Sequence, residues 1–85
     1  MKHTLYKTQG TCSQFIDVTV DENDVIQQVV FYGGCHGNLQ GISRLVTGRK
    51  IDDVIGILNG IRCGDKATSC PDQLAKALRK AVENG

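Results

Sequence analysis

The sequence predicts an α+β domain in which a small antiparallel sheet is packed by about three helices. Two runs with strand character, residues 12–20 and 25–32, are separated by a polar turn cluster at 21–24. Apolar residues recur at helical spacing in three later segments, whose ends carry residue types that begin and end helices.

The predicted hairpin begins with the alternating run at residues 12–20. Four side chains of this run share one face of the strand: Cys12, Ile16, Val18 and Val20. After the turn, residues 25–32 are β-branched and aromatic, which favours a second strand. We also expect a short strand at 5–7, followed by a break at Gly10. A hairpin of this kind needs a third strand or helices to be stable.

The first two predicted helices each end at a glycine, and the second of them is short. Asn38 is the expected N-cap of the first helix, and Thr47-Gly48 ends it. Its apolar stripe comprises Leu39, Ile42, Leu45 and Val46. The second helix begins at Asp52 or a neighbouring residue and ends at Asn59-Gly60. Its apolar stripe comprises Ile51, Val54, Ile55 and Leu58.

The last predicted helix covers about residues 71–83 and follows a loop at 61–67 that carries Cys63. The side chains expected to face the core are Leu74, Leu78, Ala81 and Val82. Those expected to face solvent are Lys76, Arg79, Lys80 and Glu83.

Length and composition limit the class of protein. Eighty-five residues are enough for one domain, which buries only about 60–65% of its unfolded surface. The net charge of +1 does not favour a nucleic-acid partner. No apolar stretch approaches the roughly 20 residues of a membrane helix, so we expect no membrane association. The N-terminus has no signal-peptide pattern, and we expect a cytoplasmic protein with reduced thiols. Two disulfides in a secreted protein are the alternative.

The four cysteines, Cys12, Cys35, Cys63 and Cys70, all lie at predicted element ends or in a loop. Cysteines in such places can converge when the chain folds, and four thiolates at one point form a metal or cluster site. The site prediction is therefore that Cys12, Cys35 and Cys70 converge with Cys63 close by, binding zinc or an iron–sulfur cluster.

Cys70 lies at a predicted helix start. With Pro71 at the first helical position, Cys70 is the N-cap; alternatively Ser69 is the cap and Asp72 occupies a box-like position. In either case the helix dipole stabilises a thiolate and lowers the pKa of the thiol. Alternatively, Cys70 has no chemical role and is simply a small buried hydrophobic residue that precedes a helix.

The other two cysteine settings leave alternatives open. Glycines surround Cys35 and give its backbone freedom to turn, which also resembles an anion nest, although the Lys-Ser/Thr ending of a P-loop is missing. The adjacent His36 is expected to be an outer-sphere donor or a surface residue. Cys63 either completes a four-sulfur shell or acts as a resolving thiol for Cys70.

No residue pattern supports catalysis by this chain. There is no Cys-x-x-Cys pair and no histidine–acid pairing of a hydrolase. His3, near the N-terminus, is assigned no role. Four carboxylates are expected to be solvated or to serve turns and caps: Asp17, Asp52, Asp53 and Asp65. Asp72, in the first turn of the last helix, is expected to interact favourably with the positive end of the helix dipole.

The segment Thr68-Ser69-Cys70-Pro71-Asp72 spells the motif of the TSCPD domain family, and the chain resembles that family over most of its length. Gly34-Cys35-His36-Gly37-Asn38 and Gly41-Ile42 are part of the resemblance. It implies that residues 1–85 form a single TSCPD-type domain, related to a domain of adenosylcobalamin-dependent ribonucleotide reductases. Through this shared domain, the resemblance implies kinship with ribonucleoside-diphosphate reductase and a link to DNA synthesis. The chain is too short to be a complete reductase.

The chain also resembles the iron–sulfur cluster scaffolds of the IscU and NifU type. In this resemblance Cys12, Cys35 and Cys70 match the three scaffold cysteines, which implies an IscU/NifU-like α+β fold. Gln14 stands where the scaffolds have aspartate, and Ser69 where they have histidine. The additional Cys63 favours a closed, structural site.

Three functional hypotheses follow. The first is a non-catalytic metal- or iron–sulfur-binding domain with four thiolate ligands. The second is an accessory domain related to ribonucleotide reductase, in which Cys70 and Cys63 shuttle reducing equivalents. The third is an inert protein-interaction module. A protein partner is expected, either ribonucleotide reductase or the cluster-assembly machinery.

Overall fold

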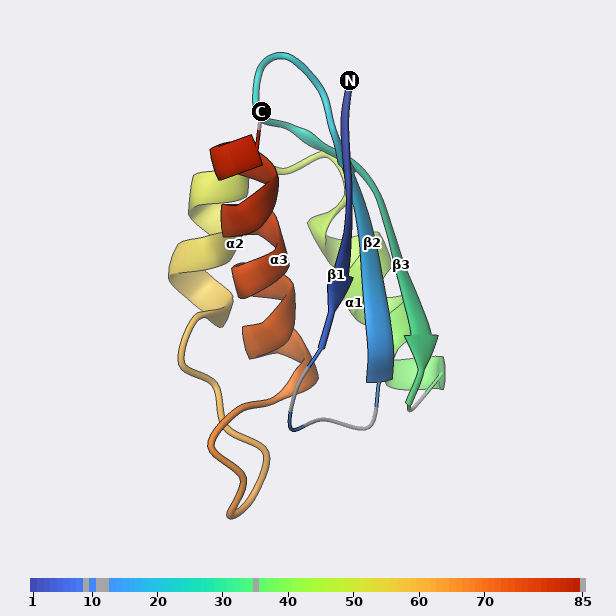
Figure 1. Ribbon diagram of the computed structural model, residues 1–85, viewed down its shortest axis with the longest axis vertical. Coiled ribbons are helices and arrows are strands. Elements are labelled where there is room, and N and C mark those ends of the chain that lie inside the picture. Colours follow the sequence, from blue (N-terminus) through green and yellow to red (C-terminus); the bar gives the residue numbers. More distant parts are fainter. Residues whose placement is uncertain (9, 11–12, 35, 85) are drawn as a thin grey trace.

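The structure is a computed structural model that describes residues 1–8, 10, 13–34 and 36–84. Its elements are β1 (Lys2–Lys7), β2 (Ser13–Val20), β3 (Ile26–Gly33), α1 (His36–Val46), α2 (Ile51–Leu58) and α3 (Cys70–Asn84). The strands form an antiparallel sheet in the order β1-β2-β3, and the helices pack against it (Figure 1). The predicted α+β class is confirmed.

The alternation in β2 decides which face of the sheet is covered. Ile16, Val18 and Val20 are completely buried and belong to one apolar core with residues of all three helices. The register places Ile16 between Tyr6 of β1 and Phe31 of β3, and both of these side chains pack against the same core. The first strand is longer than the predicted segment 5–7, because β1 pairs with β2 from Lys2 onward.

The turn between β2 and β3 is held by Asp21. Its Oδ1 accepts hydrogen bonds from the amides of Asn23 (2.8 Å) and Val25 (3.0 Å). The bond from the Val25 amide is the main cause that lowers the pKa of Asp21. Next to the turn, the amide of Ile51 donates to the oxygen of Asp24 at 2.9 Å, which fixes the start of α2 at the same end of the sheet.

The helices differ from the predictions at three positions. Asn38 is not the N-cap of α1, because the helix already begins at His36, two residues after Gly34. Gly33 and Gly34 both have positive φ. Leu45 is 69% exposed, since the buried stripe of α1 runs through Leu39 and Val46. Val82 of α3 is 42% exposed, whereas Ala81, which was also expected to face the core, is completely buried.

Helix α3 lies at the centre of the packing. It contacts β1, β2 and α2, and it buries Leu74 and Leu78 completely. Three alanines of this helix are also completely buried: Ala75, Ala77 and Ala81. Their small side chains allow α3 to pack closely against its neighbours. Within the described residues, no helix is long and apolar enough to cross a membrane.

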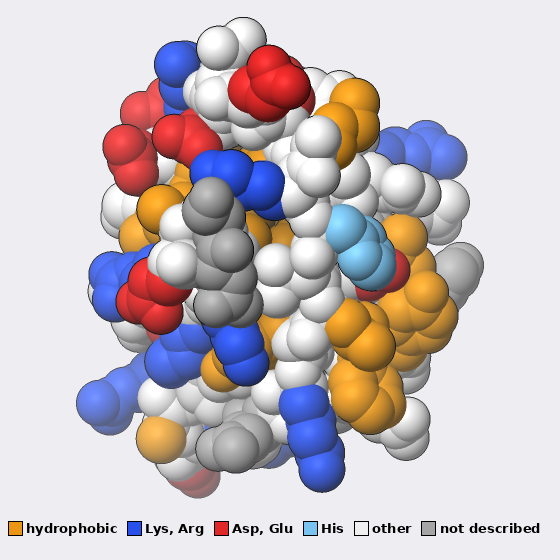
Figure 2. All heavy atoms as spheres, turned by 45° about the horizontal axis from the view of Figure 1, so that its top comes forward, with side chains coloured by type: hydrophobic (Ala, Val, Ile, Leu, Met, Phe, Trp, Pro, Cys, Tyr) orange, Lys and Arg blue, Asp and Glu red, His pale blue; other side chains and the backbone are white. Residues whose placement is uncertain are grey.

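The opposite face of the sheet carries apolar side chains that no described element covers. Leu5 is 54% and Tyr32 48% exposed, and they line a hollow of about 260 Å³ together with Phe15. The hollow also contains a close contact between His3 Nε2 and Asp17 Oδ1 at 2.6 Å, which the sequence did not predict. Figure 2 shows hydrophobic side chains gathered beside a histidine.

The buried position of α3 leads to a first prediction. Leu78→Ala should lower the free energy of unfolding by about 2–5 kcal/mol, because it leaves a cavity in a close-packed core. Leu45→Ala removes the same atoms from an exposed site on α1. It should change the free energy of unfolding by roughly 0.5 kcal/mol or less. Urea denaturation of both variants tests this, and equal losses would contradict the assignment of the core.

Candidate functional site

The structure describes two of the four predicted ligands. Cys70 is the first residue of α3 and is half-buried, and Cys63 is exposed in the loop before it. The two cysteines are not joined by a disulfide. Cys12 and Cys35 lie outside the described residues, and the same holds for the side chain of His36. The predicted convergence of all four sulfurs therefore stays a prediction.

Ser69 is the N-cap of α3. Its Oγ accepts a hydrogen bond from the amide of Asp72 at 3.1 Å, and its carbonyl accepts from the amide of Gln73 at 2.9 Å. The structure thus matches the alternative in which Ser69, and not Cys70, caps the helix. The Ser69 hydroxyl also donates to the carbonyl of Ile61 at 2.6 Å. One small side chain thereby caps the helix and holds the preceding loop.

Asp72 binds the same loop from the first turn of α3. Asp72 is only 3% exposed. Its carboxylate accepts hydrogen bonds from the amide of Gly60 (2.7 Å), the hydroxyl of Thr68 and the ammonium of Lys76 (2.7 Å). The Lys76 ammonium, followed by the Thr68 hydroxyl and the Gly60 amide, lowers the pKa of Asp72 to about 2. The sequence predicted its place in the first turn but not this burial.

Thr68 completes the network. Its hydroxyl donates to Asp72 and accepts from Nε2 of Gln73 at 2.9 Å. Both Thr68 and Gln73 are buried, so these hydrogen bonds replace water around groups that solvent cannot reach. Three of the five residues of the Thr-Ser-Cys-Pro-Asp segment are therefore anchors of the loop between α2 and α3. The lysine four residues after Asp72 is the sequence signal that could have indicated this role.

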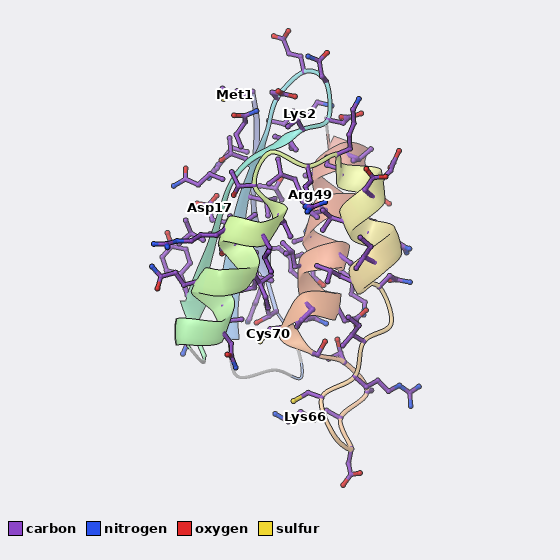
Figure 3. All side chains as sticks on the ribbon, turned by 180° about the vertical axis from the view of Figure 1, so that it is seen from behind. Met1, Lys2, Asp17, Arg49, Lys66 and Cys70 are labelled. Atoms are coloured by element: carbon purple, nitrogen blue, oxygen red, sulfur yellow. The ribbon has the colours of Figure 1, made fainter. Side chains whose placement is uncertain are left out.

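Cys63 begins a tight turn whose ends are fixed by the backbone. The Cys63 amide donates to the oxygen of Thr68 at 3.1 Å, and the Lys66 amide donates to the oxygen of Cys63 at 3.0 Å. Gly64 adopts φ +57°, a value that suits glycine best. Figure 3 shows Cys70 at the start of α3 and Lys66 in the loop at the same end of the molecule. Backbone pairing therefore brings the segment of Cys63 next to the segment that leads into Cys70.

The described neighbours of Cys12 and Cys35 lie at this end as well. A Cβ atom added to Gly10, which has φ +73°, would lie 3.1 Å from Cγ2 of Thr68. Ser13, at the start of β2, pairs with Gly33 at the end of β3. The chain segments on either side of Cys12 thus contact, respectively, the segment before Cys70 and the segment before Cys35.

No metal-ligand cluster is formed by the residues that the structure describes. These residues contain no group of three or more histidine, cysteine, aspartate or glutamate side chains that could hold a metal ion. Cys63 and Cys70 alone provide two thiol ligands, whereas structural zinc sites have four ligands. The site predicted from the sequence depends on Cys12 and Cys35.

Comparison with known proteins establishes the family. The family model of the TSCPD domain matches residues 1–82. The chain belongs to the TSCPD domain family. This membership is consistent with a non-catalytic domain related to ribonucleotide reductases. No curated protein and no solved structure matches the chain, so the resemblance to IscU and NifU scaffolds is not confirmed.

The low pKa of Asp72 leads to a second prediction. Because the pKa falls from 3.8 to about 2 on folding, the ionised carboxylate stabilises the native TSCPD domain by about 2 kcal/mol above pH 4. This contribution should decrease as the pH falls from about 4 toward 2, where the native carboxylate takes up its proton.

The unfolding free energy measured at several pH values tests this prediction. Asp72→Asn should be less stable than the wild type at pH 7, and the difference should shrink at low pH. Asp53→Asn, at an exposed position in the first turn of α2, is the matched control and should retain the pH dependence of the wild type. An unchanged pH profile in Asp72→Asn would contradict the assignment.

Proposed function

We propose that this TSCPD domain is a non-catalytic metal- or iron–sulfur-binding domain whose ligands are Cys12, Cys35, Cys63 and Cys70. The observation that carries the proposal is the gathering of the described flanking segments of all four cysteines at one end of the fold. The contact of Gly10 with Thr68, the pairing of Ser13 with Gly33 and the bond from Cys63 to Thr68 support it.

The donor set suits the proposed metal. Thiolates are soft ligands, which favour zinc and iron–sulfur clusters over magnesium or calcium. The network of Thr68, Ser69 and Asp72 holds the first turn of α3, and a ligand on a fixed element loses little conformational entropy when it binds. A bound metal would add stability to a domain of this size, because a small hydrophobic core by itself stabilises the fold only weakly.

Elemental analysis of protein purified without added metal is the primary experiment. We expect a stoichiometric amount of zinc or iron in the wild type. Cys12→Ser, Cys35→Ser, Cys63→Ser and Cys70→Ser should each lose most of it, because each removes one ligand. Ala67→Ser, at an exposed position in the same loop, is the control and should retain the metal.

The outcomes separate the alternatives. Full metal content in Cys63→Ser, together with loss in the other three variants, would exclude Cys63 from the ligand set. Wild-type protein that contains no zinc or iron and binds neither after addition would overturn the proposal and favour the inert interaction module.

A third prediction concerns the coupling of metal binding to stability. Removal of the metal with a chelator should lower the melting temperature of the wild type, and Cys70→Ser should not respond to the chelator. Cysteine binds metal as the thiolate, so protons compete with the metal and the stabilisation should weaken as the pH falls below neutrality. Calorimetric melting curves at several pH values, with and without chelator, provide the measurement. Identical curves with and without chelator would contradict the coupling.

A further inference from the structure

The outer edge of β3 is paired only at its beginning. Ile26 donates its amide to the oxygen of Arg49 (2.9 Å) and accepts from the amide of Gly48 (2.8 Å), and Val25 forms an antiparallel bridge with Lys50. From Gln28 to Gly33, no backbone hydrogen bond within the described part of the chain closes this edge. Figure 1 shows β3 as the last strand of the sheet.

This open edge offers the hydrogen-bonding chemistry of a strand. Successive residues of a strand direct their amide and carbonyl groups to opposite sides, so pairing with β2 leaves alternate residues of β3 directed outward. The segment Gly48–Lys50 already occupies the position of a fourth strand beside Ile26. Because this pairing is antiparallel, Gly48 lies nearest to the rest of the edge, and the chain before it belongs to α1, which ends at Val46. The rest of the edge remains unpaired by described residues.

A groove accompanies the open edge, between β3 and α1. It has a volume of about 280 Å³ and is lined by Val29, Phe31 and Gly33 of β3 and by Leu39, Gln40 and Ser43 of α1. Val29 and Leu39 are 6% and 4% exposed and form an apolar floor, while Gln40 is exposed at the rim. Gln40 and Ser43 add polar groups to the helical wall.

We propose that the groove between β3 and α1 binds an extended peptide segment as a fourth, antiparallel strand. The peptide backbone pairs with the open edge of β3 and continues the pairing that Gly48–Lys50 begins. Its alternate side chains enter the groove, where the apolar floor selects aliphatic residues. A helical partner satisfies its own backbone groups and has none to offer this edge, whereas an extended segment supplies both donors and acceptors.

Phage display of short random peptides against the full-length chain, under reducing conditions, tests the proposal. We expect enriched sequences to alternate aliphatic and polar residues. A synthetic peptide of the enriched sequence should shift the amide NMR signals of residues 28–33 and of Gln40 and Ser43. Methylation of alternate peptide amides should weaken binding at least about tenfold in one of the two alternating sets only, because the other set points away from β3.

A matched pair of variants localises the binding. Gln40→Trp places a large side chain at the rim of the groove and should weaken the same peptide at least about tenfold. Leu45→Trp introduces the same side chain at an exposed position of α1 outside the groove and should bind like the wild type. Melting temperatures establish that both variants fold. If Gln40→Trp fails to fold, the methylated peptides still test the pairing.

Several results would overturn the proposal. These are the absence of any enriched peptide, equal affinity of the wild type and Gln40→Trp, and peptide-induced shifts confined to other surfaces. A dimer that forms through the β3 edge and excludes every peptide would assign this edge to a second copy of the chain. The metal-binding proposal does not depend on this test, because the peptide assay reports on β3 and α1, and metal content is measured separately.

Discussion

The carboxylate of Asp72, in the first turn of α3, binds Gly60, which follows α2, and Thr68, which precedes α3. A buried charge is costly unless it is paired and hydrogen-bonded, and Asp72 meets this requirement with an amide, a hydroxyl and an ammonium group. The loop must therefore return to α3 at a defined place. This constraint sets where Cys63 and Cys70 stand relative to the sheet.

The residues of the segment 68–72 have different roles. Thr68, Ser69 and Asp72 are buried and serve the network, whereas Cys70 lies half-buried at the helix start. An arrangement in which polar neighbours hold a cysteine at a helix N-terminus is suited to a thiolate ligand, because neither the loop nor the helix has to reorganise. The proposed peptide groove borders this end of the fold: Gly33 and Gly34 line it and precede Cys35 in the chain.

Much of the fold follows from local patterns. The alternation of Ile16, Val18 and Val20 predicted a half-buried strand, and glycines marked the ends of α1 and α2 at Gly48 and Gly60, where φ is positive. Two of the errors in the helices occurred where adjacent apolar residues were both expected to face the core. Leu45 and Val82 fit a helical stripe as well as their neighbours, and only packing against the sheet decided that Val46 and Ala81 face the core.

The sequence by itself determined the α+β class, the order of strands and helices, the family motif and the four cysteines as the chemically notable residues. The tertiary structure decided the burial of Asp72, the contact of His3 with Asp17 and the open edge of β3 beside α1. The physical reason is distance along the chain. Periodicity and capping act over a few residues and can be read locally, whereas the partners of Asp72 extend to Gly60, and the pairing of Ile26 with Arg49 exists only after the chain has folded.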